Sequence, residues 1–193
     1  MSPQGKQPNM KIKSILVFGL LFFMATTFSK VEATASVADP SAILLPEQSL
    51  SARARILQKQ AITNVLVRYD SPMKANADAF MDVAYVYNLH PYFIPAIAGL
   101  ESGFGRHIKP NSHIAFGWGG GRIVFENWDS AIMTVGKSMR TKYIDRDIVT
   151  ISSIARVYAP PSTTWSSKVV FFMTQFEKEE EKLLKLHEAV QAS

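Results

Sequence analysis

The chain contains no cysteine among its 193 residues. Disulfides and thiolate sites are therefore excluded, and an apolar core must supply the stability of the fold. Apolar residues make up 47% of the chain and charged residues 19%, which is typical of a globular domain and not of a disordered chain. The lack of cysteine does not oppose export from the cell, because it excludes only stabilisation by disulfides.

Motifs for phosphate and metal binding are absent as well. Neither G-x-x-x-x-G-K-[ST] nor G-x-G-x-x-G can be written in the glycine-rich region, so no phosphate-binding loop is expected there. The histidines form no H-x-x-x-H or H-E-x-x-H pattern, and His90, which precedes Pro91, is more typical of a helix start than of a metal ligand. We expect neither a metal nor a cofactor.

The chain has little excess charge once its amino terminus is set aside. The formal charge is +5 at pH 7, but the residues up to Ala33 hold four lysines and one glutamate, which leaves about +2 for the rest. Arg53, Arg55 and Lys59 are spread along an expected helix and form no basic stripe. We therefore expect no nucleic-acid partner, while a modest positive charge is compatible with an anionic polymer.

Residues 1–38 have the pattern of a secretory leader. Lysines precede an uncharged run of about 15 residues, Ser14 to Phe28, which is short for a membrane span. Small residues that suit signal cleavage occur at several positions between Val31 and Ala38, and Met10 is an alternative start. An uncleaved signal anchor, which would tether the domain to the outer face of the cytoplasmic membrane, stays open.

Glu101 follows an uncharged segment. Pro91 to Leu100 contains a single polar group, a tyrosine hydroxyl, which predicts a largely buried helix that brings Glu101 into or beside the core. Apolar surroundings disfavour the charged form of a carboxyl group, and a neutral carboxylic acid can protonate a glycosidic oxygen. The alternative is that Glu101 simply ends a helix in solvent.

Six of the ten glycines lie between residues 103 and 121, around the aromatic residues Phe104, Phe116 and Trp118. Glycines permit close approach of the backbone. Aromatic faces beside exposed amides suit a sugar ring, which has a C–H face to stack and hydroxyls to hydrogen-bond. This region therefore predicts a carbohydrate groove. The alternative is a glycine-rich turn region with its aromatic residues in the core.

Three segments follow one another in a characteristic order: 97–105 (IAGLESGFG), 112–119 (SHIAFGWG) and 154–161 (IARVYAPP), with Trp165 after them. Together they resemble the lysozyme-like superfamily, and within it the bacterial peptidoglycan glucosaminidases and lytic transglycosylases. The resemblance extends roughly over residues 89–176, and the ordered set is much more specific than any single segment.

The resemblance implies roles for individual residues. In that family the Glu of the first segment is the general acid and the Tyr of the third lies close to it, which implies that Glu101 and Tyr158 are catalytic. One departure is Ile114, where relatives often carry Asn in a polar contact to substrate. We expect contact with the substrate at Ser102, Phe104, Ser112, Phe116, Gly117 and Trp118.

Glycosidases of this chemistry usually need two carboxylates, but only Glu101 stands out. Glu126 and Asp129 are candidates for the second, although their positions favour helix-capping acids. A single acid suffices if the substrate's own N-acetyl or 6-hydroxyl group attacks the anomeric carbon, as the resemblance to lytic transglycosylases implies. Hydrolase and transglycosylase stay open, as does a non-catalytic wall-binding or scaffold module on the same fold.

The apolar periodicity predicts a mainly α-helical, lysozyme-like domain of about six helices. We expect a Gly-rich loop or small hairpin at residues 117–125, beside a cleft between the end of the Glu101 helix and Tyr158. The helices are expected at residues 49–69, at 72–88, from after Pro91 to Glu101, from Asn127 or Asp129 to Tyr143, at 150–158, and from Trp165 onward after a cap at Thr163 or Thr164.

The sequence predicts four segments along the chain. We expect a leader at 1–38, a linker outside the core at 39–48, a lysozyme-like catalytic domain at 49–177 and a charged, solvated helix extension at 178–193. The resemblance implies cleavage of β-1,4 bonds in the N-acetylglucosamine/N-acetylmuramic acid strands of peptidoglycan. From the leader we expect secretion to the periplasm or the extracellular cell wall, and we expect a monomer. Contact with a membrane is expected only through an uncleaved leader.

Overall fold

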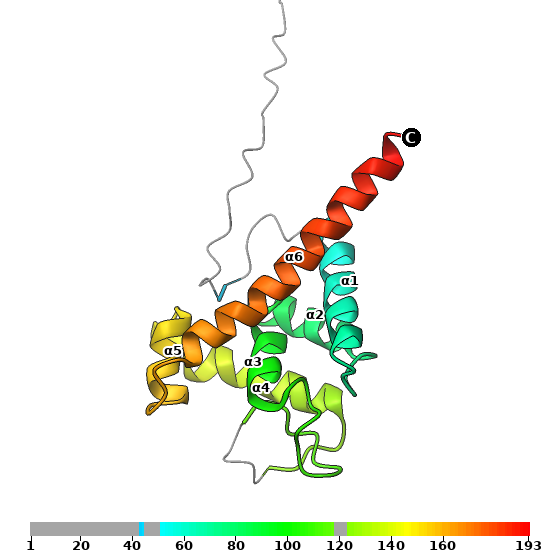
Figure 1. Ribbon diagram of the computed structural model, residues 1–193. Coiled ribbons are helices and arrows are strands. Elements are labelled where there is room, and N and C mark those ends of the chain that lie inside the picture. The colour runs from blue at the N-terminus through cyan, green and yellow to red at the C-terminus, as the bar shows by residue number, and fades with distance from the viewer. Residues whose placement is uncertain (1–42, 45–50, 118–122) are drawn as a thin grey trace, which may run out of the picture. The chain divides into compact units, whose positions relative to one another are not determined.

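The computed structural model describes residues 43–44, 51–117 and 123–193, which all belong to the unit formed by residues 37–193. This part is mainly α-helical, as predicted (Figure 1). An isolated antiparallel bridge joins Leu44 and Leu89. The elements in chain order are α1 (Ala52–Arg68), α2 (Ala77–Val86), α3 (Phe93–Ser102), α4 (Trp128–Lys142), the 3-10 helix η3 (Ile144–Arg146), α5 (Ile151–Tyr158) and α6 (Trp165–Gln191).

Three helices begin where the sequence predicts a helix start. In α4 the side chains of Asn127 and Ser130 form a capping box, and Thr150 and Ser153 do the same for α5. These bonds satisfy N–H groups that have no partner within the first helical turn. α6 begins after Thr164, one of the two predicted caps, although its side chain makes no capping bond. The predicted starts of these three helices are confirmed.

α3 is the most deeply buried helix around the candidate site. Every residue from Phe93 to Gly99 is buried. α3 packs extensively against α6 and also contacts α2 and α4. Because so much of its surface is covered, the helix holds only apolar and small residues over this range. The buried helix predicted before Glu101 is confirmed.

α6 contacts α1, α3 and α5, and Figure 1 shows it running obliquely across them. Val169, Met173 and Phe176 are fully buried on its inner face. The ring of Phe176 stacks on that of Tyr92, with centroids 5.3 Å apart and an interplanar angle of 13°. Residues 185–193 are exposed, and the last turns of the helix project past α1 (Figure 1).

Part of the expected linker belongs to the core. Ile43 is fully buried, and its carbonyl accepts the backbone N–H of His90 at 2.7 Å. Its apolar side chain packs with Leu89 in the core cluster, so the chain at this point does not run outside the core as expected. The leader, most of the linker and residues 118–122 of the expected hairpin lie outside the described residues.

The charged segment after Phe176 also differs from the expectation of a solvated helix. Glu179 is only 5% exposed. Its carboxylate accepts a hydrogen bond from Asn64 Nδ2 at 2.9 Å and is bonded to Arg68 Nη2. These bonds join α6 to α1 beyond their apolar contact, and α6 runs through the predicted boundary at residue 177 without a break.

Candidate functional site

α3 ends directly after Glu101. Gly103 caps the helix in the left-handed conformation, with φ 58° and ψ 46°, and Phe104 and Gly105 also have positive φ angles of 61° and 83°. Glycine adopts this conformation readily, whereas phenylalanine pays on the order of 1 kcal/mol. The chain therefore turns sharply away from α3 and leaves the half-buried carboxylate of Glu101 at the helix end.

The hydroxyl of Ser102 holds this turn closed. Its oxygen lies 3.0 Å from the carbonyl oxygen of Ala98 and 2.8 Å from that of Ala115, to which it can donate, and it accepts the N–H of Gly105 at 2.8 Å. Ser102 is 4% exposed. A single buried hydroxyl thus ties together the end of α3, the turn after it and the loop at residues 112–117.

Three other residues expected to contact a ligand are also buried. Phe104 and Phe116 are fully buried and Ser112 is 3% exposed, so their side chains support the loop from inside and do not line its outer surface. Gly117 is the exposed member of the set. Trp118, the remaining one, lies outside the described residues. The structure therefore brings most of the predicted site residues together. Four of the six residues expected to contact the substrate are, however, buried.

Gly117 lies directly against Glu101. A Cβ atom built on Gly117 would be 2.6 Å from Glu101 Oε2 and 3.0 Å from Cδ, closer than real Cβ atoms come to such groups. The φ angle of Gly117 is 64°, which also favours glycine. The loop backbone therefore passes so close to Oε2 that a side chain on this residue would force either the carboxylate or the loop to move.

The other oxygen of Glu101 is held by Trp165, the first residue of α6. The indole Nε1–H donates to Oε1 at 2.8 Å. Trp165 is 4% exposed, so its ring belongs to the core while its one polar group reaches the carboxylate. The motif set included Trp165, but nothing in the sequence indicated that its indole bonds Glu101.

Tyr158, the last residue of α5, closes the arrangement. Its hydroxyl donates to the carbonyl of Phe116, and its ring lies 5.1 Å from that of Trp165 at an interplanar angle of 41°. Burial raises the pKa of the Tyr158 phenol well above its usual range, and the negative charge of Glu101 raises it further. The phenol therefore stays neutral at ordinary pH and acts as a hydrogen-bond donor.

These contacts form a closed ring. Glu101 bonds Trp165, whose ring meets Tyr158, which bonds Phe116, whose neighbour Gly117 lies on Glu101. The end of α3, the loop and Tyr158 come together, and the start of α6 joins them. In this arrangement the two carboxylate oxygens of Glu101 have different surroundings.

The candidates for a second carboxylate have other partners or are exposed. Asp129 Oδ1 accepts a hydrogen bond from Asn76 Nδ2 at 2.7 Å. It lines a pocket of about 330 Å³ between α2 and α4, beside Asp78 and Asp82. Glu126 is exposed, and the cap of α4 is neither acid but the Asn residue between them. Among the described residues, no group of three or more acidic or histidine side chains could hold a metal ion.

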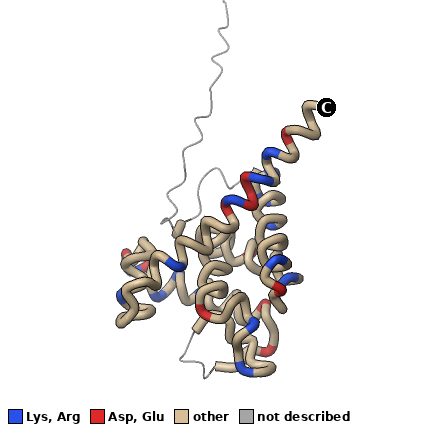
Figure 2. Tube along the Cα trace, viewed as in Figure 1, with Lys and Arg blue, Asp and Glu red and all other residues tan. Residues whose placement is uncertain are grey.

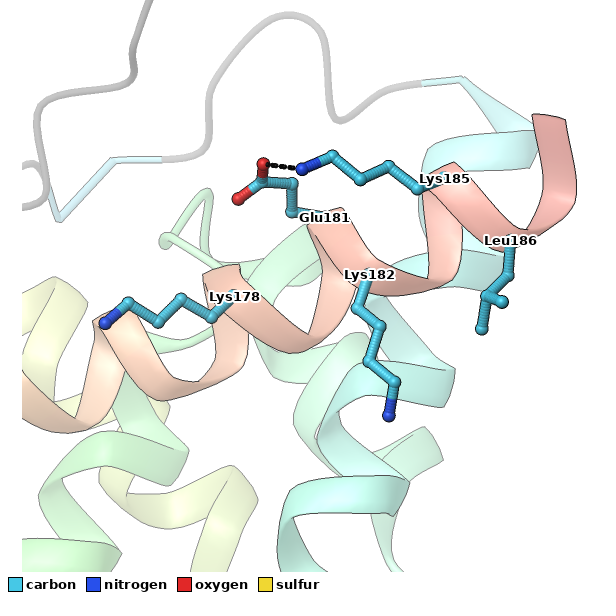
Figure 3. Close-up of a pocket in the computed structure, with 5 residues that line it drawn as sticks. All are labelled: Lys178, Glu181, Lys182, Lys185 and Leu186. Carbon is cyan, nitrogen blue, oxygen red and sulfur yellow. Dashed lines mark hydrogen bonds and ion pairs between the residues drawn. The ribbon is translucent and has the colours of Figure 1, made fainter. Parts of the chain in front are cut away.

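A second pocket lies on the surface of α6 (Figure 3). Lys185 Nζ bonds Glu181 Oε1 at 2.6 Å, while Lys178 and Lys182 point away from this pair in Figure 3. The pocket begins about 20 Å along the helix from Trp165. Charges of both signs alternate along this half of α6 (Figure 2). Because its charged groups do not converge, the pocket offers no arrangement for a particular ligand.

Tyr92 and two glutamates of α6, Glu177 and Glu180, form a group of titratable residues, although the sequence predicts a solvated helix in this segment of α6. The hydroxyl of Tyr92 donates to Glu180 Oε2 at 2.5 Å. Burial raises the pKa of Glu180, and burial together with the charge of Glu180 raises that of Glu177. The spacing of Glu180 from Met173 and Phe176, by seven and four residues, is the signal that places it on the buried face.

Comparisons with known proteins bear on the fold. No protein-family model and no curated protein matches the sequence. Among solved structures, the chain is similar to S. aureus autolysin E, solved in complex with the muropeptide NAM-L-Ala-D-iGlu. The TM-score is 0.50 and the identity 16%, over 72% of this chain and 71% of that chain. At this identity the likeness concerns the fold alone, and the chain shares the mainly helical fold of that autolysin.

Within the described ranges, no helix is long and apolar enough to span a membrane.

Proposed function

We propose that the protein is a peptidoglycan-degrading glycosidase that cleaves β-1,4 bonds of the N-acetylglucosamine/N-acetylmuramic acid glycan, with Glu101 as the general acid. The observation that carries this proposal is the setting of Glu101. Its half-buried carboxylate ends a buried helix, with one oxygen bonded by Trp165 and the other under the exposed backbone of Gly117. Such a setting suits an acid that meets a substrate lying along the loop.

In this proposal Glu101 gives its proton to the glycosidic oxygen, and the bond from that oxygen to the anomeric carbon breaks. The anomeric carbon is attacked either by water or by the substrate's own N-acetyl or 6-hydroxyl group. The second route needs no further carboxylate, and Asp129 is hydrogen-bonded to Asn76, the residue before α2. Hydrolase and lytic transglycosylase are therefore two forms of the same proposal.

The remaining predicted site residues have supporting roles in the proposal. Tyr158 stays neutral and fixes the carbonyl of Phe116, so the loop backbone keeps its place beside Glu101. Ser102 secures the turn from below. Phe104 and Ser112, which are buried, keep the loop in shape, and substrate contact falls to the backbone near Gly117 and to Trp118.

The fold supports the substrate class. Autolysin E was solved with a muropeptide, so in that protein the shared fold accommodates a peptidoglycan fragment. The three motifs around Glu101 agree with this substrate. Residues 1–38 have the composition of a secretory leader, and we propose a secreted monomer in the periplasm or the cell wall, with membrane contact only through an uncleaved leader.

One observation favours a second candidate, a wall-binding or scaffold module without catalysis. Ile114, which replaces the polar residue of many relatives, is 7% exposed and part of the core. A polar contact to substrate at this position is therefore lost. Both candidates predict binding to peptidoglycan, so binding by itself does not separate them.

Digestion of purified sacculi separates the candidates. The protein lacking its leader is incubated with sacculi from about pH 4 to pH 8, and soluble muropeptides are analysed by mass spectrometry. The proposal predicts the release of soluble fragments. Anhydro ends would identify a transglycosylase and reducing ends a hydrolase. A folded protein that co-sediments with sacculi but releases nothing at any pH would be a binding module.

A further inference from the structure

The two oxygens of Glu101 differ in what faces them. Oε1 accepts the indole N–H of Trp165 at 2.8 Å. Oε2 lies under Gly117, at the place where a Cβ atom would be 2.6 Å away. Trp165 is buried and Gly117 is exposed, so the first oxygen points into the fold and the second toward the side on which a ligand could arrive.

We propose that Trp165 is a positioning residue that reserves Oε1 as an acceptor and so assigns proton donation to Oε2. This inference rests on the proposed function, because it concerns the same acid. Trp165 is 4% exposed and does not reach the surface of the loop, so it acts on the reaction through Glu101 and not by touching the substrate.

The chemistry of the indole group gives the reason. An indole N–H can only donate, and on a neutral carboxylic acid the better acceptor is the carbonyl oxygen, which carries no proton. With Trp165 bonded to Oε1, the proton therefore lies on Oε2. After the proton has left for the glycosidic oxygen, the same N–H still donates to the carboxylate and stabilises the charge that has formed.

The position of the indole is fixed by the contacts around it. The ring of Tyr158 lies 5.1 Å from that of Trp165, and its hydroxyl is bonded to the carbonyl of Phe116. The terminal torsion of a glutamate side chain is otherwise broad and roughly two-fold. Without the N–H, either oxygen of Glu101 could face Gly117 and the productive orientation would be only one of several.

The contact is tested without any assay of activity. In a ¹⁵N–¹H spectrum, the indole signal of Trp165 is the one that disappears in Trp165→Phe. We expect Glu101→Ala to move this signal strongly and to leave the indole signal of Trp128 in place. A Trp165 signal that stays where it is in Glu101→Ala would overturn the contact and the inference with it.

The role in catalysis is tested by the steady-state kinetics of Trp165→Phe on soluble glycan fragments, with Trp128→Phe as the control for loss of an indole. We expect kcat to fall about tenfold or more, since a hydrogen bond to a charged group is lost, while KM stays unchanged. Trp128→Phe should keep both values. If Trp165→Phe does not fold, Trp165→Leu, which also lacks a hydrogen-bond donor, is measured in the same way.

The outcomes distinguish this inference from the proposed function. Wild-type kcat in Trp165→Phe, or a rise in KM that accounts for the whole loss, would overturn the inference and leave the glycosidase proposal intact. A wild-type protein that releases no fragments would overturn both, even where the indole signal shows the contact to Glu101.

Discussion

Gly117 and Glu101 are in such close contact that a single added methyl group would collide with the carboxylate. The Cβ atom of an alanine at this position would be 2.6 Å from Oε2. Gly117 also has a φ angle of 64°, where alanine is strained by roughly 1–2 kcal/mol. The absence of a side chain in the loop is thus as much a part of the candidate site as the acid itself.

Gly117→Ala should therefore displace either the loop or the carboxylate. We expect the release of muropeptides from sacculi to fall on the order of 100-fold, because a displacement of about 1 Å is enough to misalign a reacting group. Gly103→Ala is the matched control. It has a similar φ angle of 58°, but its Cβ would meet the exposed imidazole of His107, which can move aside. Equal activity of the two variants would contradict the role given to Gly117.

Tyr158→Phe removes the hydrogen bond to the carbonyl of Phe116 and keeps the ring against Trp165. We expect kcat to fall on the order of tenfold with a much smaller change in KM, since the phenol is bonded to the loop backbone next to Gly117. Tyr87→Phe, at the end of α2, is the control. Unchanged turnover in Tyr158→Phe would leave Tyr158 as a core tyrosine with no part in the reaction.

Glu179→Ala should destabilise the junction of α6 and α1. The carboxylate accepts from Asn64 and is bonded to Arg68, and its removal loses hydrogen bonds to a charged group, which contribute about 1.5–3 kcal/mol each. Urea denaturation of wild type and variant measures the free energy of unfolding. Glu188→Ala, on the exposed end of the same helix, should leave it unchanged. Equal stability of all three proteins would show that the buried carboxylate does not hold these helices together.

His90 predicts a dependence of stability on pH. Burial lowers the pKa of its imidazole from 6.5 to about 4, so between these values the unfolded chain binds a proton that the folded protein does not. The resulting stability is complete above about pH 6.5 and is lost as the pH falls toward 4, by about 3 kcal/mol in total.

His90→Asn removes the titrating group and keeps an acceptor near the position of Nδ1, which accepts the backbone N–H of Tyr92 at 3.3 Å. Thermal unfolding between pH 7 and pH 4.5 should then show a smaller loss of stability on acidification than in wild type. The same change at the exposed His187 serves as control. Parallel curves for wild type and His90→Asn would contradict the buried, neutral state of this histidine.

The helices could be predicted because their signals are local. The uncharged run before Glu101, the caps at Asn127 and Thr150 and the glycine after α3 each act within a few residues. The clustering of Glu101 with Tyr158 was implied by the family resemblance that the three motifs carry. Neither prediction needed the distances between segments far apart in the chain.

The contacts between segments that are far apart in the chain could not be predicted from the sequence. Nothing local in the sequence indicates that Trp165 bonds Glu101 or that Glu179 reaches Arg68, since both depend on how α6 crosses α3 and α1. The aromatic residues of the loop were weighed as sugar contacts and as core. Burial of Phe104 and Phe116 agrees with the second possibility, because the loop needs apolar support beneath its exposed backbone.

In the proposed reaction, Glu101 donates the proton that breaks the glycosidic bond. Glu101→Gln keeps the shape of the side chain and an acceptor for Trp165 but has no acidic proton. With purified sacculi, and with circular dichroism to verify folding, we predict that muropeptide release by Glu101→Gln falls on the order of 100-fold or more below wild type while co-sedimentation with sacculi persists. Release at the wild-type rate by the folded variant would contradict the claim.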